Sequence, residues 1–181
     1  MRPSFLPRLA NGPFDDPGLF APMAFQKRTL LFDLGDLSNL APSDLLKISH
    51  VFVSHAHMDH FSGFDQLLRL LLGRPIHLHL YGPFGFLKNI DGKLKAYTWN
   101  LLPNYSKALK LTVTEIRRDK YIRQVFDAKD GFAPSNMIVE DRHDAQLLMD
   151  PAFVVSTVIL DHRIPCLAFA VMEMIKTVIK L

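Results

Sequence analysis

The chain has 181 residues, of which 49% are hydrophobic and 22% charged, and its formal net charge is +3. This balance is typical of one soluble globular domain with a substantial core, and it excludes a disordered or strongly polybasic chain. A single cysteine, Cys166, excludes a disulfide framework within the chain and favours a reducing compartment, so we expect a cytoplasmic protein. Cys166 itself is interpreted as a small core residue.

Neither secretion nor membrane insertion is expected from the sequence. Prolines interrupt the N-terminal segment, where a signal peptide needs a continuous apolar run. The longest apolar tract, residues 164–181, is broken by Glu173, Lys176 and Lys180. For this reason the tract is not interpreted as a transmembrane segment.

Strand and helix patterns are mixed along the chain, which predicts an α/β layered domain. Residues 11–22 are rich in Pro, Gly and Asp and are expected to be irregular. Leucines at helical spacing predict a helix over residues 65–72, which Gly73 and Pro75 end. A second helix is expected near residues 86–97. The predicted strands cover residues 28–32, 48–54, 76–81, 111–116, 121–126, 137–139 and 153–160.

The most informative segment is residues 55–60, His-Ala-His-Met-Asp-His, which directly follows an apolar strand pattern. Crowded imidazoles are unfavourable unless they bind something, and divalent transition-metal ions are their natural partners. Because a strand presents alternate side chains on one side, we expect His55 and His57 to converge on one ion. A turn after residue 58 would direct Asp59 and His60 to a second ion. The alternative, a hydrogen-bonded polar turn, is less favoured.

This segment resembles the H-x-H-x-D-H signature of the metallo-β-lactamase superfamily, and residues 51–74 are similar to its ribonuclease Z branch. Residues 30–35, Leu-Leu-Phe-Asp-Leu-Gly, are similar to the strand-Asp-turn that precedes the metal motif of the family. Residues 160–170 resemble the next metal-ligand segment, in which the matching histidine is His162.

The resemblance implies an αβ/βα sandwich with two Zn²⁺ ions at the edges of the sheets. The ligands that it implies for the first ion are His55, His57 and His162. Those that it implies for the second are Asp59 and His60, and Asp59 is also the catalytic residue that orients or deprotonates the attacking water. Asp33 is interpreted as a hydrogen-bonding partner of the metal-bearing loop. A plain turn residue at the end of a strand is the alternative.

The function that the resemblance implies is hydrolysis of a phosphodiester by a metal-bound hydroxide, as in the endoribonuclease that processes the 3′ end of tRNA. Precursor tRNA or a small phosphodiester is then the expected substrate. Because one metal motif serves several chemistries, two alternatives stay open. One is a hydrolase of a small ester, lactone or nucleotide, and the other is a truncated, non-catalytic remnant.

A complete two-metal site of this family needs a further Asp and a further His from downstream segments, and ribonuclease Z-like proteins carry a late His-Glu-Ala-Thr motif. None of these follows Ala170 in the sequence. We therefore expect residues 1–181 to form a single metallo-hydrolase domain that is C-terminally incomplete. It would comprise the N-terminal half to two-thirds of the sandwich, and a homodimer is left open.

Two other groups of residues offer weaker functional signals. His77 and His79 share one face of a predicted strand, where such pairs can chelate a metal, but nothing nearby completes a site and a structural role is favoured. The basic residues of segment 117–123 are able to contact phosphates. Since Asp119 and the neighbouring Glu115 interrupt their charge, a solvated face is the preferred interpretation.

Overall fold

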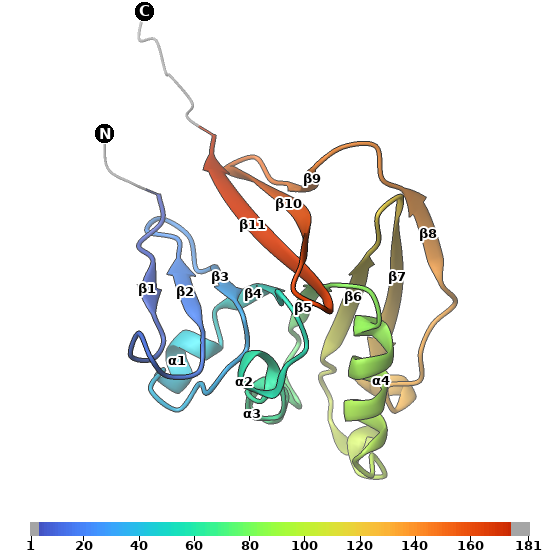
Figure 1. The fold of residues 1–181 in the computed structure, drawn as a ribbon. Helices are drawn as coiled ribbons and strands as arrows, with labels where there is room; N and C mark the ends of the chain where they lie inside the picture. The colour runs from blue at the N-terminus through green and yellow to red at the C-terminus, as the bar shows by residue number, and fades with distance from the viewer. Residues whose placement is uncertain (1–3, 175–181) are drawn as a thin grey trace, which may run out of the picture.

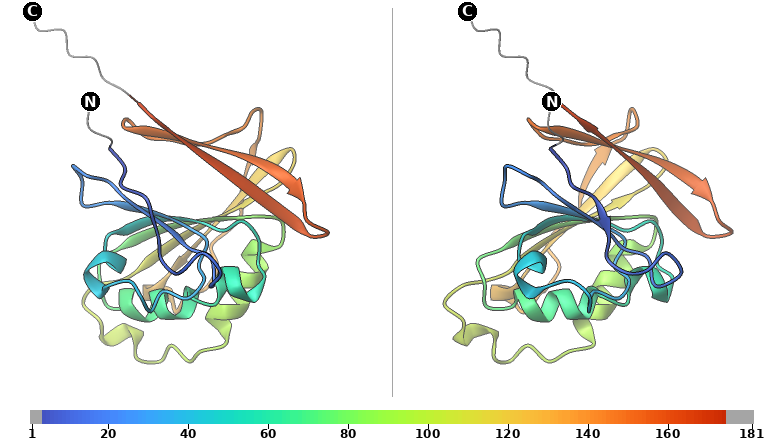
Figure 2. Two further views of the ribbon diagram at one scale, coloured as in Figure 1. Left: turned by 60° about the vertical axis from the view of Figure 1, so that its left-hand side comes forward. Right: turned by 90° about the vertical axis from the view of Figure 1, so that its left-hand side faces the viewer.

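The computed structural model describes residues 4–174. Its elements form three layers, with an eight-stranded sheet in the middle, helices on one face and a three-stranded sheet on the other (Figures 1 and 2). The large sheet runs from β1 to β8 in chain order, and the small sheet has the order β11-β10-β9.

The large sheet is parallel from β3 to β6 and antiparallel at its two ends. Parallel strands bring their carboxyl ends to one edge of a sheet, so the loops that follow β3, β4 and β5 lie at the same edge. The strands are β1 (Arg8–Leu9), β2 (Leu19–Pro22), β3 (Thr29–Phe32), β4 (Ile48–Phe52), β5 (His77–Gly82), β6 (Lys110–Ile116), β7 (Lys120–Asp127) and β8 (Ile138–Asp141).

The helices cover one face of this sheet. They are α1 (Pro42–Leu45), α2 (Met58–Phe61), α3 (Phe64–Leu71) and α4 (Phe86–Lys95), with two 3₁₀ turns, η1 (Leu102–Asn104) and η2 (Ala128–Asp130). Helix α3 buries its leucines against the sheet, as their spacing predicts. Beyond its end Gly73 has a φ of +72°, a conformation that glycine adopts without strain.

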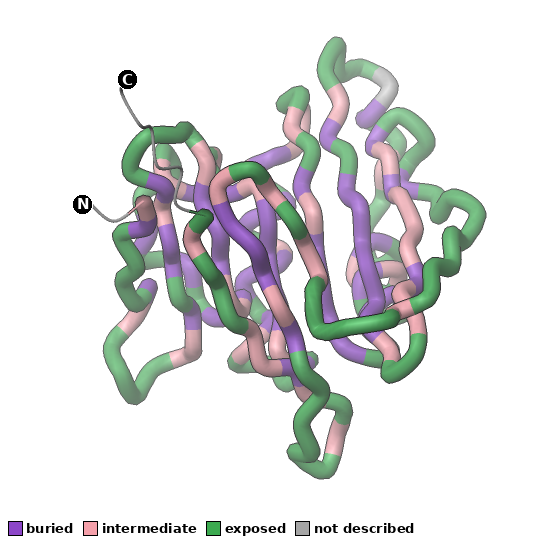
Figure 3. The backbone as a smooth tube through the Cα atoms, turned by 90° about the horizontal axis from the view of Figure 1, so that it is seen from above, coloured by how far each residue is buried: buried purple, intermediate pink, exposed green. Residues whose placement is uncertain are grey.

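The small sheet packs on the opposite face and consists of β9 (Gln146–Met149), β10 (Phe153–Asp161) and β11 (Pro165–Glu173), all antiparallel. The side chains of β4 alternate between the two layers. Val51 packs in the core on the helical side, and Phe52 packs in the core between the sheets with Phe153 and Leu167. Both faces of β4 are therefore buried, as its continuous apolar sequence predicts. Figure 3 shows buried residues along the central strands.

Most of the predicted elements are present with shifts of a few residues at their ends. One expectation is wrong: residues 11–22 are not irregular throughout, because Leu19–Pro22 forms β2. Three further strands, β1, β9 and β11, are not among the predicted ones. Strands β1 and β9 are short, and from the sequence the residues of β11 are interpreted as part of a metal-ligand segment and of an apolar tract. The apolar tract at residues 164–181 contributes β11, and its last part, residues 175–181, lies outside the described residues. In residues 4–174 we find no helix whose length and apolarity would let it cross a membrane.

Candidate metal centre

His55 and His57 lie at the carboxyl end of β4, on the loop that leads into α2. The expectation that alternation along a strand orients them is wrong, since β4 ends at Phe52 and both histidines are in the loop. The loop nevertheless turns their rings together, and His55 Nε2 is 3.1 Å from His57 Nδ1.

His162 reaches the same place from the small sheet. It follows β10, in the turn of the β10–β11 hairpin, and its ring centroid is 5.0 Å from that of His55. One ligand nitrogen from each of His55, His57 and His162 lies within 4.8 Å of the other two. A tetrahedral zinc site with Zn–N bonds of about 2.0–2.1 Å separates its nitrogens by roughly 3.3 Å. The three imidazoles therefore fit one zinc ion after small adjustments.

One hydrogen bond holds the hairpin in this position, and a second one shapes its turn. The backbone N–H of Leu167 donates to the carbonyl oxygen of Ser54 at 2.8 Å, which ties β11 to the loop after β4. Within the turn, the carboxylate of Asp161 accepts from the backbone N–H of Arg163 at 2.9 Å. Arg163 has a φ of +62°, so the turn is tight directly after His162.

Asp59 and His60 lie on α2, beside these three histidines. The ring centroids of His60 and His55 are 3.9 Å apart, and His60 Nε2 is 3.5 Å from Asp59 Oδ2. These two atoms lie close enough together to be considered as one pair. Among residues 4–174 we find one group of three metal-ligating side chains, and it consists of His55, His57 and His162.

Asp33 connects the loop after β3 to this centre. Its Oδ1 accepts from the backbone N–H of Ser54 at 2.7 Å, and its Oδ2 lies 2.9 Å from His60 Nδ1. Asp33 adopts a φ of +63°, a conformation that Asp tolerates better than most residues. The interpretation of Asp33 as a hydrogen-bonding partner of the metal-bearing loop is confirmed. By holding Nδ1 of His60, it leaves Nε2 available as a ligand.

Ser54 plays a part that the sequence analysis missed. Its hydroxyl donates to Asp33 Oδ2 at 3.0 Å, so its oxygen accepts from His55 Nδ1, which is 2.9 Å away. This arrangement selects the tautomer in which His55 Nε2 carries the lone pair and faces His57. The available signal was a hydroxyl residue directly before the first histidine of the motif.

The electrostatics of the centre favour neutral imidazole at His55. Burial lowers its pKa first, the neighbouring His60 and His57 lower it further, and Asp33 opposes them. Neutral imidazole is the form that binds a metal.

Cys166 is half-buried, with its sulfur 3.9 Å from His55 Nδ1, so its interpretation as a core residue is wrong. Burial and the charge of Asp33 raise the pKa of its thiol.

Helix α2 is fixed to the loop after β3 by close backbone contact. The N–H of Leu34 donates to the carbonyl of His60 at 2.9 Å, and the N–H of Gly63 donates to the carbonyl of Leu34 at 2.8 Å. A Cβ atom at Gly63 would lie only 2.2 Å from the carbonyl oxygen of Gly35. Only glycine permits this approach, and the approach sets the position of His60 relative to Asp33.

Comparisons with known proteins show what this chain is similar to. Residues 16–94 match the model of the metallo-β-lactamase superfamily. The solved structure of the metallo-β-lactamase fold protein YhfI from Bacillus subtilis superposes with a TM-score of 0.54 at 17% sequence identity, covering 90% of this chain and 52% of that one. The predicted resemblance to the superfamily is confirmed, and the chain has the α/β architecture of the metallo-β-lactamase fold.

Within that class, the curated relatives include proteins named ribonuclease Z. The Ribonuclease Z of Deinococcus radiodurans is 28% identical over 147 residues, which cover 80% of this chain and 44% of the relative. The Zinc phosphodiesterase ELAC protein 1 of Mus musculus is 28% identical over 161 residues, with 79% of this chain and 44% of the relative covered. The chain thus spans less than half the length of these two relatives.

Proposed function

We propose that this chain is a zinc-dependent phosphodiesterase of the ribonuclease Z type, an endoribonuclease that acts on RNA such as precursor tRNA. The observation that carries the proposal is the convergence of His55, His57 and His162 within 4.8 Å of one another. The names of the relatives support the choice of RNA as substrate.

The ligands we propose for the first zinc ion are His55 Nε2, His57 Nδ1 and a ring nitrogen of His162. For a second ion we propose His60 Nε2 and the carboxylate of Asp59. Zinc held by these residues would supply a water molecule of lowered pKa, and its positive charge would offset the negative charge of the phosphodiester.

The protein's own groups hold and move protons around these ligands. Asp33 accepts the Nδ1 proton of His60, and Ser54 accepts that of His55, so both rings keep the orientation needed for binding. The side chain of Asp59 is 54% exposed, which gives its carboxylate access both to an attacking water and to solvent. We assign it the role of accepting the proton of that water and releasing it to solvent.

The proposal is tested by incubating the zinc-loaded chain with a precursor tRNA carrying a 3′ trailer, and in parallel with bis-p-nitrophenyl phosphate and a lactone. Cleavage of the precursor at the trailer, lost in Asp59→Asn and kept in His77→Ala, is the expected result. Turnover of the lactone alone would assign the site to a different substrate class. A chain that binds no zinc would contradict the proposal altogether.

A further inference from the structure

A cavity of about 1090 Å³ lies between the β6–β7 turn and the β10–β11 hairpin. Pockets for small molecules have volumes of roughly 300–1,000 Å³, so this cavity is large even for a drug-sized ligand. Its floor includes Val158, Ile159 and Leu160, which are 42–49% exposed. Four guanidinium groups and an exposed aromatic ring surround this floor. We call it the arginine groove, and these five residues are Phe84, Arg117, Arg118, Arg142 and Arg163.

The four arginines divide into two that are fixed and two that are free to meet a ligand. Arg142 donates to the backbone carbonyls of Thr157, Arg117 and Asp144, the shortest of these bonds being 2.7 Å. Arg117 forms a salt bridge of 2.8 Å with the buried Glu115. Within residues 4–174 the exposed guanidinium groups of Arg118 and Arg163 have neither a hydrogen bond nor a salt bridge.

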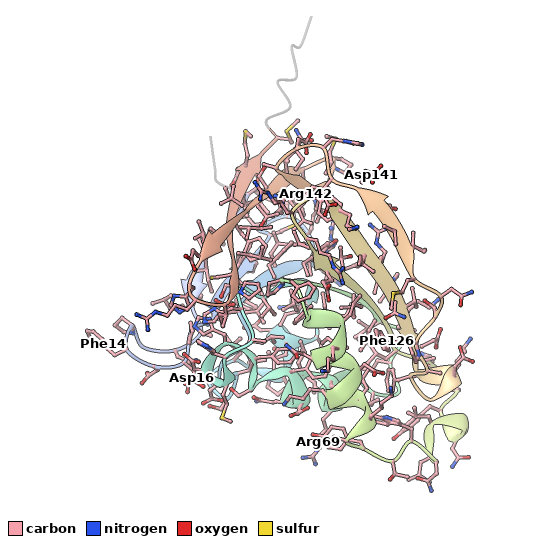
Figure 4. All side chains as sticks on the ribbon, turned by 45° about the vertical axis from the view of Figure 1, so that its right-hand side comes forward. Phe14, Asp16, Arg69, Phe126, Asp141 and Arg142 are labelled. Carbon is pink, nitrogen blue, oxygen red and sulfur yellow. The ribbon has the colours of Figure 1, made fainter. Side chains whose placement is uncertain are left out.

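The basic segment at residues 117–123 is therefore split by the fold. Arg123 forms a salt bridge of 3.0 Å with Glu140 and does not line the groove, whereas Arg117 and Arg118 do. The preferred interpretation of the whole segment as a solvated face was too coarse, because it treated the four basic residues as one group. Figure 4 shows Arg142 on the side of the small sheet and Arg69 on the opposite, helical side.

Phe84 adds a surface for stacking. Its side chain is 60% exposed, and the guanidinium of Arg117 lies 4.9 Å from the centroid of its ring. An aromatic ring that is exposed and backed by a cation is the usual platform for an unpaired base, with base–aromatic stacking contributing about 1–3 kcal/mol.

The groove reaches the β10–β11 turn, which carries His162. Asp161 and Arg163, the two neighbours of His162 in the chain, both line it. None of the five proposed metal ligands lines the groove itself, but a polymer lying in it would pass the turn that holds His162.

The charges favour an anionic polymer over a protein segment. Three carboxylates, those of Asp119, Asp144 and Asp161, also line the groove, and Arg117 is already paired with Glu115, so the attraction for an anion rests on Arg118 and Arg163. The carboxylates of Asp144 and Asp161 accept backbone N–H groups in their own turns. Covering Arg118 and Arg163 with a neutral peptide would remove two charges from water without a partner, whereas phosphates would pair with both.

We propose that the arginine groove binds a single-stranded segment of RNA and leads it to the metal centre. Arg118 and Arg163 contact its phosphates, and Phe84 stacks on a base. The choice of RNA rests on the proposed function, but the groove itself is defined by its own residues.

The test measures binding of a fluorescein-labelled, unstructured RNA of about 12 nucleotides by anisotropy, in 50 mM salt with a chelator present. Because each phosphate contact on a single strand releases about 0.7 counterion, losing one contact weakens binding about eightfold at this salt concentration. We expect this loss for Arg118→Gln and for Arg163→Gln, with a multiplicative effect in the double variant. The slope of log affinity against log salt falls by about 1.4 in the double variant.

Phe84→Ala weakens binding without changing the slope. The matched control is Arg69→Gln, an exposed arginine on α3, which leaves affinity unchanged.

Equal affinity of the double variant and the unsubstituted chain would overturn the proposal, as would a chain that binds no RNA. A change of oligomeric state in Ile159→Ser, with RNA affinity unaltered, would identify a protein as the occupant and also overturn it. Since binding is measured without metal, the two proposals fail separately. RNA bound through the groove by a chain that holds no zinc leaves the groove proposal standing. If the double variant still cleaves precursor tRNA and binds RNA with normal affinity, the groove proposal is refuted while the proposed function stands.

Discussion

Two groups of histidines have opposite arrangements: those of residues 55–60, which follow β4, and those on the strands themselves, His50, His77 and His79. In the first group, ring nitrogens converge and a carboxylate holds the opposite nitrogen of His60. In the second, His50 and His79 stack face to face at 4.8 Å with 11° between their planes, and His77 packs on His79 at 4.2 Å with a tilt of 31°. His77 donates to or accepts from the hydroxyl of Thr112 at 2.7 Å. Spacing of i, i+2 occurs in both groups, so spacing alone does not predict a metal site.

The two groups differ because one lies in a loop and the other on a pleated surface. Regular strands set side chains parallel to one another, which favours stacking of flat rings. A loop that leaves the sheet allows rings to turn toward a common point. It also places them beside the loop after β3, from which Asp33 supplies its carboxylate.

The largest expected effect is the loss of zinc binding when a converging histidine is removed. We expect His57→Ala to weaken zinc affinity by more than about 100-fold, because it removes a direct ligand from a three-ligand site. Competition against a chromophoric chelator measures the affinity. The matched variant His77→Ala, in the stacked group, should bind zinc normally. If both variants lose zinc equally, the contrast between the groups is false.

Removing the carboxylate that holds His60 should have the next largest effect. We expect Asp33→Asn to reduce metal affinity by about 10- to 100-fold, the range found for groups that orient metal ligands. Asn tolerates the positive φ at this position, so the change isolates the lost acceptor from backbone strain. The same chelator competition serves as the readout. Unchanged affinity would mean that Asp33 is only a turn residue.

The stacked histidines should instead control stability in acid. Burial lowers the pKa of His50 to about 3 and that of His79 to about 4. In the unfolded chain both titrate near 6.5, so their stabilising effect is complete above that pH and is lost as the pH falls toward 4. His50→Phe keeps a stacked ring and removes the titration. We expect it to retain about 2 kcal/mol of unfolding free energy that the unsubstituted chain loses between about pH 7.5 and 5. Urea unfolding at the two pH values measures this difference, and an identical decline in both chains would show that burial at His50 does not matter.

The smallest effect concerns the tautomer of His55. Ser54→Ala removes the hydroxyl that donates to Asp33 and accepts from His55 Nδ1. Losing the bond to His55, worth about 1 kcal/mol, should weaken zinc affinity about fivefold. Ser54→Thr retains the hydroxyl and should restore most of the affinity. If the alanine and threonine variants bind zinc alike, the hydroxyl does not select the tautomer.

From the sequence, the residues of the candidate site could be named, but their arrangement in space could not be predicted. His55, His57 and His162 could be named because their motifs are specific, although His162 is more than 100 residues away from the others. The role of Ser54 could not be predicted, since it depends on where Asp33 lies after folding. The arginine groove also escaped prediction, because a linear run of basic residues does not show which of them pair with Glu115 or Glu140. Strand β11 could not be predicted from its own residues, because it is a strand through its pairing with β10.

The three converging histidines come from two different layers of the molecule, two from the large sheet and one from the β10–β11 hairpin. An ion bound by all three would cross-link the layers, so occupancy and sheet packing would be thermodynamically linked. Each tenfold rise in free zinc above its dissociation constant would then add about 1.4 kcal/mol against separation of the hairpin. Amide exchange in β10 and β11 would consequently slow as zinc is added, while exchange in β6 and β7 would respond less.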